Sequence, residues 1–176
     1  MPRPVLFLDV DGVLCTPLSV RLNQVFRRPM DRQFFDPVAL FWLQKLVRRT
    51  GAQVVAQVVL SSSWRYALED GDLFTGRILQ NLYDCLAAHG APVAGIAPIL
   101  GVSKGEEIAA WVTDHPPAPY VILDDRADEF AAVPALQPHL VLVDSRRGFR
   151  RRDFRQALAL FTTQTTKKEV QPHDRL

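Results

Sequence analysis

An apolar run that ends abruptly in acidic residues most constrains the fold of this chain. Residues 5–8, Val-Leu-Phe-Leu, are followed directly by Asp9, Val10, Asp11 and Gly12. A short apolar run beside a turn signal predicts a buried strand. In an open α/β sheet, ligand sites lie at the carboxyl ends of such strands. The pattern therefore predicts an α/β protein whose first strand delivers two carboxylates to a site.

Two carboxylates at one strand end repel each other, and burying them without a partner is costly. A divalent cation resolves this conflict, and a set of oxygen ligands favours Mg²⁺. A carboxylate can also attack a phosphoryl group and form an aspartyl-phosphate. The alternatives are a calcium loop and a plain Asp-Gly turn. Because Val13, Leu14 and Cys15 supply no ligand for a calcium loop, the pattern favours a magnesium site that includes Asp9 and Asp11.

Length and composition indicate one α/β domain. The chain has 176 residues, 48% of them hydrophobic, which is enough for a sizeable core. It contains no run of eighteen apolar residues, so no membrane span is expected. The N-terminal residues lack the pattern of a secretion signal. Cys15 and Cys85 form neither a disulfide framework nor a zinc site, so we expect a cytoplasmic protein.

Strand patterns alternate with helical periodicity along the chain. Strands are predicted at 5–8, within 52–60, at 96–100, at 120–123 and at 140–143. Helices are predicted from Pro37 with Asp36 as N-cap, at 75–89, from a capping box at Ser103, and at 152–161. This alternation predicts a Rossmann-like three-layer α/β/α sandwich with a mainly parallel sheet.

Two segments lack a clear period. Residues 15–36 are interpreted as either a flap over the site or a surface loop. Residues 162–176 are polar without an apolar face, so we expect a disordered tail after a single domain that spans residues 1–161.

Polar residues of complementary chemistry follow three of the predicted strands. Besides the first pair of aspartates, these are Ser61 and Ser62, and Asp124 and Asp125, while Lys104 stands at a helix start. Asp124 or Asp125, together with Asp9 and the Val10 carbonyl, would complete the ligand shell of a Mg²⁺ ion. This ion would bridge the nucleophile and the phosphate.

These residue types suit phosphoryl transfer. Asp9 would attack phosphorus, and Asp11 would protonate the leaving oxygen and then deprotonate the hydrolytic water. Ser61 or Ser62 would donate a hydrogen bond to a phosphoryl oxygen. Lys104 would balance the phosphoryl charge, with help from the helix N-terminus.

The same residues resemble the four motifs of haloacid dehalogenase (HAD) superfamily phosphatases, over residues 4–161. Asp11 favours phosphatase over dehalogenase chemistry in that family. Three shorter segments are similar to small members without a cap domain, namely the HAD domains of RNA-repair proteins and of polynucleotide kinase-phosphatases: Ser62-Ser63-Trp64, 122–126 and 143–149. Because 12–36 and 66–102 are too short for a full cap, the site is expected to be open.

The resemblance implies a Mg²⁺-dependent phosphomonoester hydrolase, whose substrate we expect to be a nucleotide or a nucleic-acid phosphate end. Neither a membrane nor an obligate protein partner is implied. A phosphotransferase would carry the same residues. A non-catalytic HAD-fold module could instead bind nucleic acid through the basic patch, defined as Arg146, Arg147, Arg150, Arg151, Arg152 and Arg155.

The remaining candidates each keep two interpretations. Arg65 is predicted to bind a substrate phosphate, or else to lie over a helix. Asp128 is predicted to orient the metal site from behind the ligands, or else to be a surface residue. Trp64 is expected to pack in the core or to stack on a base.

Overall fold

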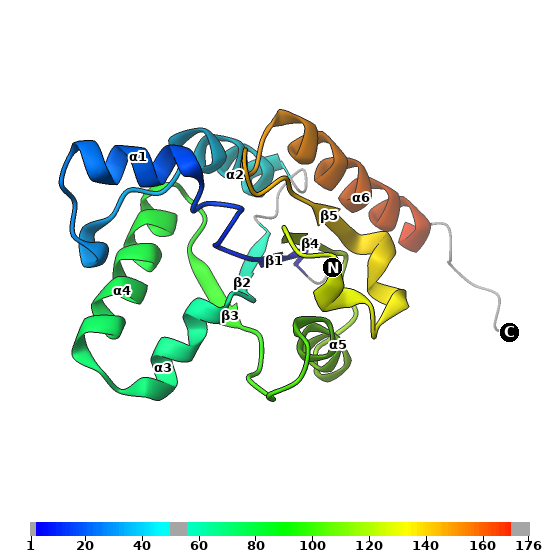
Figure 1. The fold of residues 1–176 in the computed structure, drawn as a ribbon. Coiled ribbons are helices and arrows are strands. Elements are labelled where there is room, and N and C mark those ends of the chain that lie inside the picture. Colours follow the sequence, from blue (N-terminus) through cyan, green and yellow to red (C-terminus); the bar gives the residue numbers. More distant parts are fainter. Residues whose placement is uncertain (1–2, 50–55, 170–176) are drawn as a thin grey trace, which may run out of the picture.

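A five-stranded parallel sheet forms the centre of the computed structural model, which describes residues 3–49 and 56–169 (Figure 1). The strand order is β3-β2-β1-β4-β5, so β1 lies in the middle of the sheet. The strands span Val5–Leu8 (β1), Gln57–Leu60 (β2), Val93–Ile96 (β3), Tyr120–Asp124 (β4) and Leu140–Leu142 (β5). The predicted fold class is confirmed.

The α-helices are α1 (Pro17–Val25), α2 (Pro37–Arg49), α3 (Ala67–Asp70), α4 (Leu73–Ala88), α5 (Lys104–Asp114) and α6 (Arg151–Glu169). Short 3₁₀ helices are η1 (Met30–Arg32), η2 (Ser63–Tyr66), η3 (Asp128–Phe130) and η4 (Pro134–His139). Of the described helices, none combines the length and apolar character that crossing a membrane requires.

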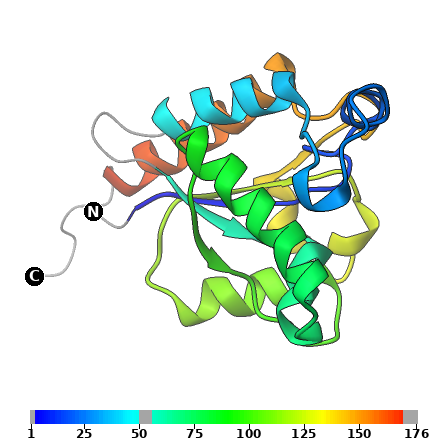
Figure 2. The same ribbon diagram turned by 90° about the vertical axis from the view of Figure 1, so that its left-hand side faces the viewer.

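Side-chain alternation along β1 produces the three layers. Leu6 and Leu8 pack into the larger apolar cluster, with residues of α2, α4 and α6. Val5 and Phe7 face the opposite side, where they pack with Ile108 of α5. Figure 2 shows α2 and α6 on one side of the strands and α5 on the other. The buried strands thus hold their carboxyl ends in fixed positions at one edge.

Two sequence-based assignments need correction. The edge strand β3 ends before Pro98, which cannot donate to a ladder, so the strand predicted at 96–100 lies earlier. Residues 15–36 are not a plain loop, because Thr16 caps α1 in a capping box with Ser19. Periodicity missed this helix because Ser19 is its only buried residue. The repeat at 52–55 lies outside the described residues.

The prediction of a disordered tail is wrong for residues 162–169, because α6 continues to Glu169. The Gln164 side chain accepts from Tyr120 N at 3.0 Å and donates to Tyr120 O at 2.8 Å. This contact holds the C-terminal part of α6 against the start of β4. The sequence of this part of α6 has no apolar periodicity that would predict a helix. Residues 170–176 lie outside the described residues.

Candidate active site

The carboxyl ends of three neighbouring strands meet at one edge of the sheet. Leu8, the last residue of β1, pairs with Leu60 on one side and Leu123 on the other. Asp9 N donates to Leu123 O and Ser61 N donates to Leu8 O, both at 3.0 Å. The strand register therefore brings together the polar residues that follow β1, β2 and β4.

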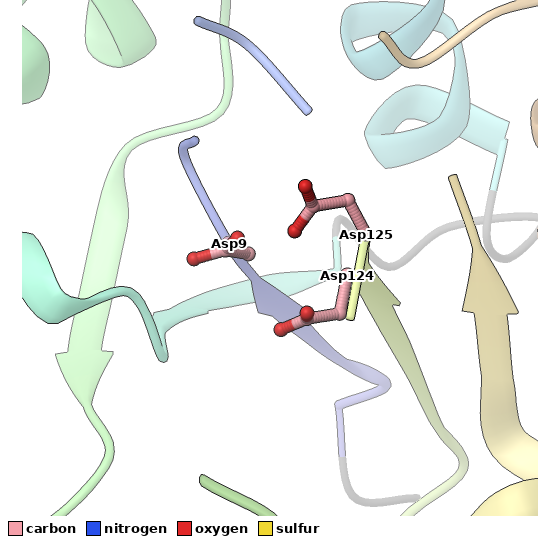
Figure 3. A group of neighbouring side chains, drawn as sticks. All are labelled: Asp9, Asp124 and Asp125. Carbon is pink, nitrogen blue, oxygen red and sulfur yellow. The ribbon is translucent and has the colours of Figure 1, made fainter. Parts of the chain in front are cut away.

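Three carboxylates form a cluster at this edge, which we call the acidic triad: Asp9, Asp124 and Asp125. One oxygen from each lies within 4.8 Å of the others, and Figure 3 shows their side chains at the ends of β1 and β4. Asp9 is 4% exposed and Asp124 is fully buried. Burial raises the pKa of the Asp124 carboxyl to about 6, and the charge of Asp9 contributes to this rise. Burial and the charge of Asp9 also raise the pKa of Asp125.

Lys104 provides the positive charge beside the triad. It is the first residue of α5, which Ser103 and Glu106 cap as predicted. Its ammonium Nζ lies 2.6 Å from Asp124 Oδ2 and 3.2 Å from Asp9 Oδ1. Burial lowers the pKa of this ammonium, but the charges of Asp9 and Asp124 outweigh that effect and leave the pKa raised.

The donor set fits a divalent cation. Three ionised carboxylates and one ammonium leave a net charge of minus two at the triad. The ligand atoms are all oxygens, which suits Mg²⁺ better than softer metals. Asp9, Asp124 and Asp125 could hold such an ion, and Asp11 lies outside this cluster. The predicted inclusion of Asp11 among the metal ligands is therefore not supported by its position.

The Val10 carbonyl was predicted as a further metal ligand, and this is wrong. Val10 O accepts from Leu14 N at 2.8 Å and from Cys15 N at 2.9 Å, which closes the turn after β1. Its lone pairs are therefore used within the turn. Sequence spacing alone could not reveal which way this carbonyl points.

Gly12 allows the turn to approach the triad closely. Its φ is +70°, a left-handed conformation that glycine adopts without strain. A Cβ at this position would lie under 3.0 Å from the side chain of Asp125. Glycine is therefore required here both by backbone conformation and by space.

We expect Gly12→Ala to lower phosphate release by more than about 10-fold, because the methyl group must displace a triad carboxylate and small misplacements of reacting groups are costly. Gly71→Ala is the matched control: its φ is +62°, but no atom lies within 4 Å of the added Cβ. Gly71→Ala should lose about 1 kcal/mol of stability in urea titrations, and Gly12→Ala at least as much. If the two variants released phosphate at equal rates, the position of the Asp125 carboxylate would not matter for activity, which would contradict this prediction.

Asp11 is oriented by an aromatic side chain. Trp64 Nε1 donates to Asp11 Oδ2 at 3.0 Å, across 53 residues of sequence. Partial burial raises the pKa of the Asp11 carboxyl, and the hydrogen bond from Trp64 opposes that rise. Trp64 also contacts the ring of Phe35, with centroids 5.8 Å apart. The expectation of packing for Trp64 is met, and the hydrogen bond adds a polar function.

The two serines after β2 differ in their surroundings. Ser62 Oγ caps η2 by accepting from Trp64 N at 3.4 Å. Ser61 Oγ is buried and has no hydrogen-bond partner in the described part of the chain. Buried hydroxyls are nearly always satisfied, so Ser61 is the better candidate for donating to a bound phosphoryl oxygen.

Arg65 was predicted to bind a substrate phosphate, and the structure contradicts this. Its side chain is 1% exposed and forms an ion pair with the equally buried Glu107. Nη1 donates to the carbonyl oxygens of Ser61 and of Ser62, the latter at 3.0 Å. Both Nη atoms are therefore committed to supporting the segment after β2.

Asp128 was predicted to support the metal site, but its side chain is 68% exposed and pairs with Arg126. Its neighbour Glu129 lies closer, because Glu129 Oε2 accepts from Lys104 N at 3.2 Å. Sequence spacing from Asp124 favoured Asp128 as the residue near the site, whereas the adjacent Glu129 is the one that contacts Lys104.

A cleft of about 380 Å³ opens over the triad. Its walls include Asp9, Asp11 and Lys104. Tyr66 and Val102 also line it and are 40% and 47% exposed, so they are accessible from solvent. No sequence motif distinguishes either residue, so neither was predicted as part of the site. In the basic patch, Arg150 is partly neutralised by Asp36 at 2.7 Å, whereas the other arginines are exposed.

Comparison with known proteins agrees with this fold. A family model described as the HAD domain in Swiss Army Knife RNA repair proteins matches residues 5–154. The solved structure of D,D-heptose 1.7-bisphosphate phosphatase from B. bronchiseptica, complexed with magnesium and phosphate, is 17% identical with a TM-score of 0.55. The match covers 94% of this chain and 99% of that one. A search of curated proteins found no match.

Proposed function

This chain belongs to the family of HAD domains in Swiss Army Knife RNA repair proteins, and we propose that it hydrolyses phosphomonoesters with Mg²⁺ through an aspartyl-phosphate on Asp9. The family match confirms the identification from sequence as a HAD-superfamily phosphatase. One observation carries the proposal: a buried aspartate lies between a lysine ammonium and two further carboxylates at a strand end.

Asp9 is placed to act as the nucleophile. Its carboxylate is nearly buried, while the cleft gives a phosphoryl group access to it. Lys104 stays protonated beside Asp9 and would offset the charge of the phosphoryl oxygens. The Ser61 hydroxyl, at the end of the neighbouring strand, would donate to one of them. A Mg²⁺ held by the triad would supply electrostatic stabilisation that neutralises repulsion between carboxylate and phosphate.

Asp11 would transfer the protons. It lies two residues after Asp9 and lines the same cleft, yet it is not part of the triad. A carboxyl whose pKa is raised by burial carries a proton more readily than an ordinary aspartate. Asp11 would donate this proton to the leaving oxygen and take one from water when the aspartyl-phosphate is hydrolysed.

A nucleotide or a nucleic-acid phosphate end is the proposed substrate. The cleft has an accessible aromatic side chain, Tyr66, which could stack on a base. The exposed arginines of the basic patch would favour a polyanion. The description of the matching family refers to RNA repair proteins, which agrees with this substrate class.

We expect removal of the metal with EDTA to abolish phosphate release, and Mg²⁺ to restore it, because without the dication Asp9 and the phosphate repel each other. Purified protein would be assayed on nucleotides, sugar phosphates, phosphopeptides and oligonucleotides with a 3′- or 5′-phosphate. Full activity after chelation would contradict the metal role. A sugar phosphate as the best substrate would contradict the nucleic-acid proposal while leaving the phosphatase intact.

A further inference from the structure

The hydrogen bond between Trp64 and Asp11 has a direction. An indole N–H can only donate, so Asp11 Oδ2 must accept in this geometry. This favours a proton of the Asp11 carboxyl on the other oxygen, Oδ1, because the carbonyl oxygen of a carboxylic acid is a better acceptor than its hydroxyl oxygen. The bond thus orients the side chain of Asp11 and favours Oδ1 as the oxygen that carries the transferable proton.

Trp64 is held by contacts of both its ring and its backbone. Its ring lies against Phe35, which is 3% exposed and immediately precedes the N-cap residue of α2. The backbone N–H of Trp64 donates to the Oγ of Ser62, the N-cap residue of η2. The segment that presents Ser61 to a phosphoryl group therefore also presents the donor that orients Asp11.

We propose that Trp64 is a positioning residue for proton transfer by Asp11, an inference that rests on the proposed function. In the first step, the new bond between Asp9 Oδ and phosphorus forms as the bond to the leaving oxygen breaks, and that oxygen takes the proton from Asp11 Oδ1. In the second step, water attacks phosphorus, its proton passes to Asp11 Oδ1, and the bond to Asp9 breaks.

The test compares two esters of similar shape in the variant Trp64→Phe, which keeps a ring but removes the N–H donor. Benzyl phosphate releases an alkoxide that needs a proton, whereas 4-nitrophenyl phosphate releases a stable phenolate. We expect kcat/KM to fall about 10-fold or more on benzyl phosphate, a part of the usual gain from acid catalysis. On 4-nitrophenyl phosphate the fall should be less than about 3-fold.

The ratio of the two kcat/KM values is the decisive quantity, because unfolded protein in the preparation lowers both values equally. Trp42→Phe is the matched control, since Trp42 packs against Phe154 in the core, and it should leave the ratio unchanged. Trp64→Phe in an Asp11→Asn background should cause little further loss on benzyl phosphate, because the positioned group is already absent.

Equal loss on both esters, or an undiminished further loss in the Asp11→Asn background, would overturn the inference and leave Trp64 as a packing residue. These outcomes are distinct from failure of the proposed function. If the wild-type protein released phosphate from no ester, or released it without Asp9, the phosphatase mechanism itself would be wrong.

Discussion

Asp9→Asn should lower the rate of phosphate release by at least about 10³-fold, while the protein stays folded. Loss of a covalent nucleophile produces effects of this size or larger. Asparagine has nearly the same shape as aspartate, but its amide cannot displace a leaving group from phosphorus. The backbone hydrogen bond from residue 9 to Leu123 O does not depend on the side chain and remains.

Stability should be unchanged or slightly higher in metal-free buffer. The charge of Asp9 is among the causes that raise the pKa of both Asp124 and Asp125, so these carboxylates repel one another. Removing one charge relieves this repulsion, while Lys104 keeps its 2.6 Å contact with Asp124. Asp9→Asn should correspondingly bind Mg²⁺ more weakly, which titration calorimetry would detect.

Asp144→Asn is the matched control, because Asp144 also follows a strand of the sheet closely but is exposed. Within the described residues, its carboxylate accepts a hydrogen bond only from Arg146 N, and an asparagine oxygen can accept the same bond. Phosphate release would be measured for both variants beside thermal unfolding. Asp144→Asn should retain near wild-type activity. Turnover by well-folded Asp9→Asn above a hundredth of the wild-type rate would rule out Asp9 as the nucleophile.

The strands and their polar ends could be predicted from the sequence for a specific physical reason. A parallel strand buried on both faces must be apolar throughout, so the first carboxylate marks its end. Parallel strands then place all such ends at one edge. This reasoning located Asp9, Ser61 and Asp124 together, and capping chemistry located the helix that presents Lys104.

Contacts between side chains far apart in sequence could not be predicted in this way. Trp64 reaches Asp11 across 53 residues, and Arg65 reaches Glu107 across 42. Local patterns give the element on which a residue lies but not the direction of a long side chain. For Arg65 this produced the wrong partner, a substrate phosphate in place of a buried glutamate.

Glu107→Gln should cost about 3–5 kcal/mol of stability, the usual effect of removing one partner from a buried ion pair. Glu107 Oε1 accepts from Leu100 N at 2.8 Å, and Oε2 accepts from Arg65. A glutamine has one oxygen for these two donors, so a donor is left facing its NH₂ group. The guanidinium charge of Arg65, which is 1% exposed, would then have no carboxylate beside it.

Asp128→Asn provides the comparison, because it breaks an ion pair with Arg126 whose side chains are 56% and 68% exposed. Exposed pairs contribute little, so its cost should be much smaller than that of Glu107→Gln. Urea midpoints at unchanged m-value would give both quantities. Equal costs for the two variants would show that the Arg65–Glu107 pair is not desolvated as the structure indicates.

Arg65→Met separates the stabilising effect of this pair from its effect on the site. Alone it leaves Glu107 buried without its cation and should cost about as much as Glu107→Gln. In Arg65→Met/Glu107→Gln neither charge remains, so the double variant should regain about 1–3 kcal/mol relative to Arg65→Met. Activity should not return with stability, because Arg65 also holds the carbonyls of Ser61 and Ser62. A double variant that recovered both would show that the arginine contributes to folding alone.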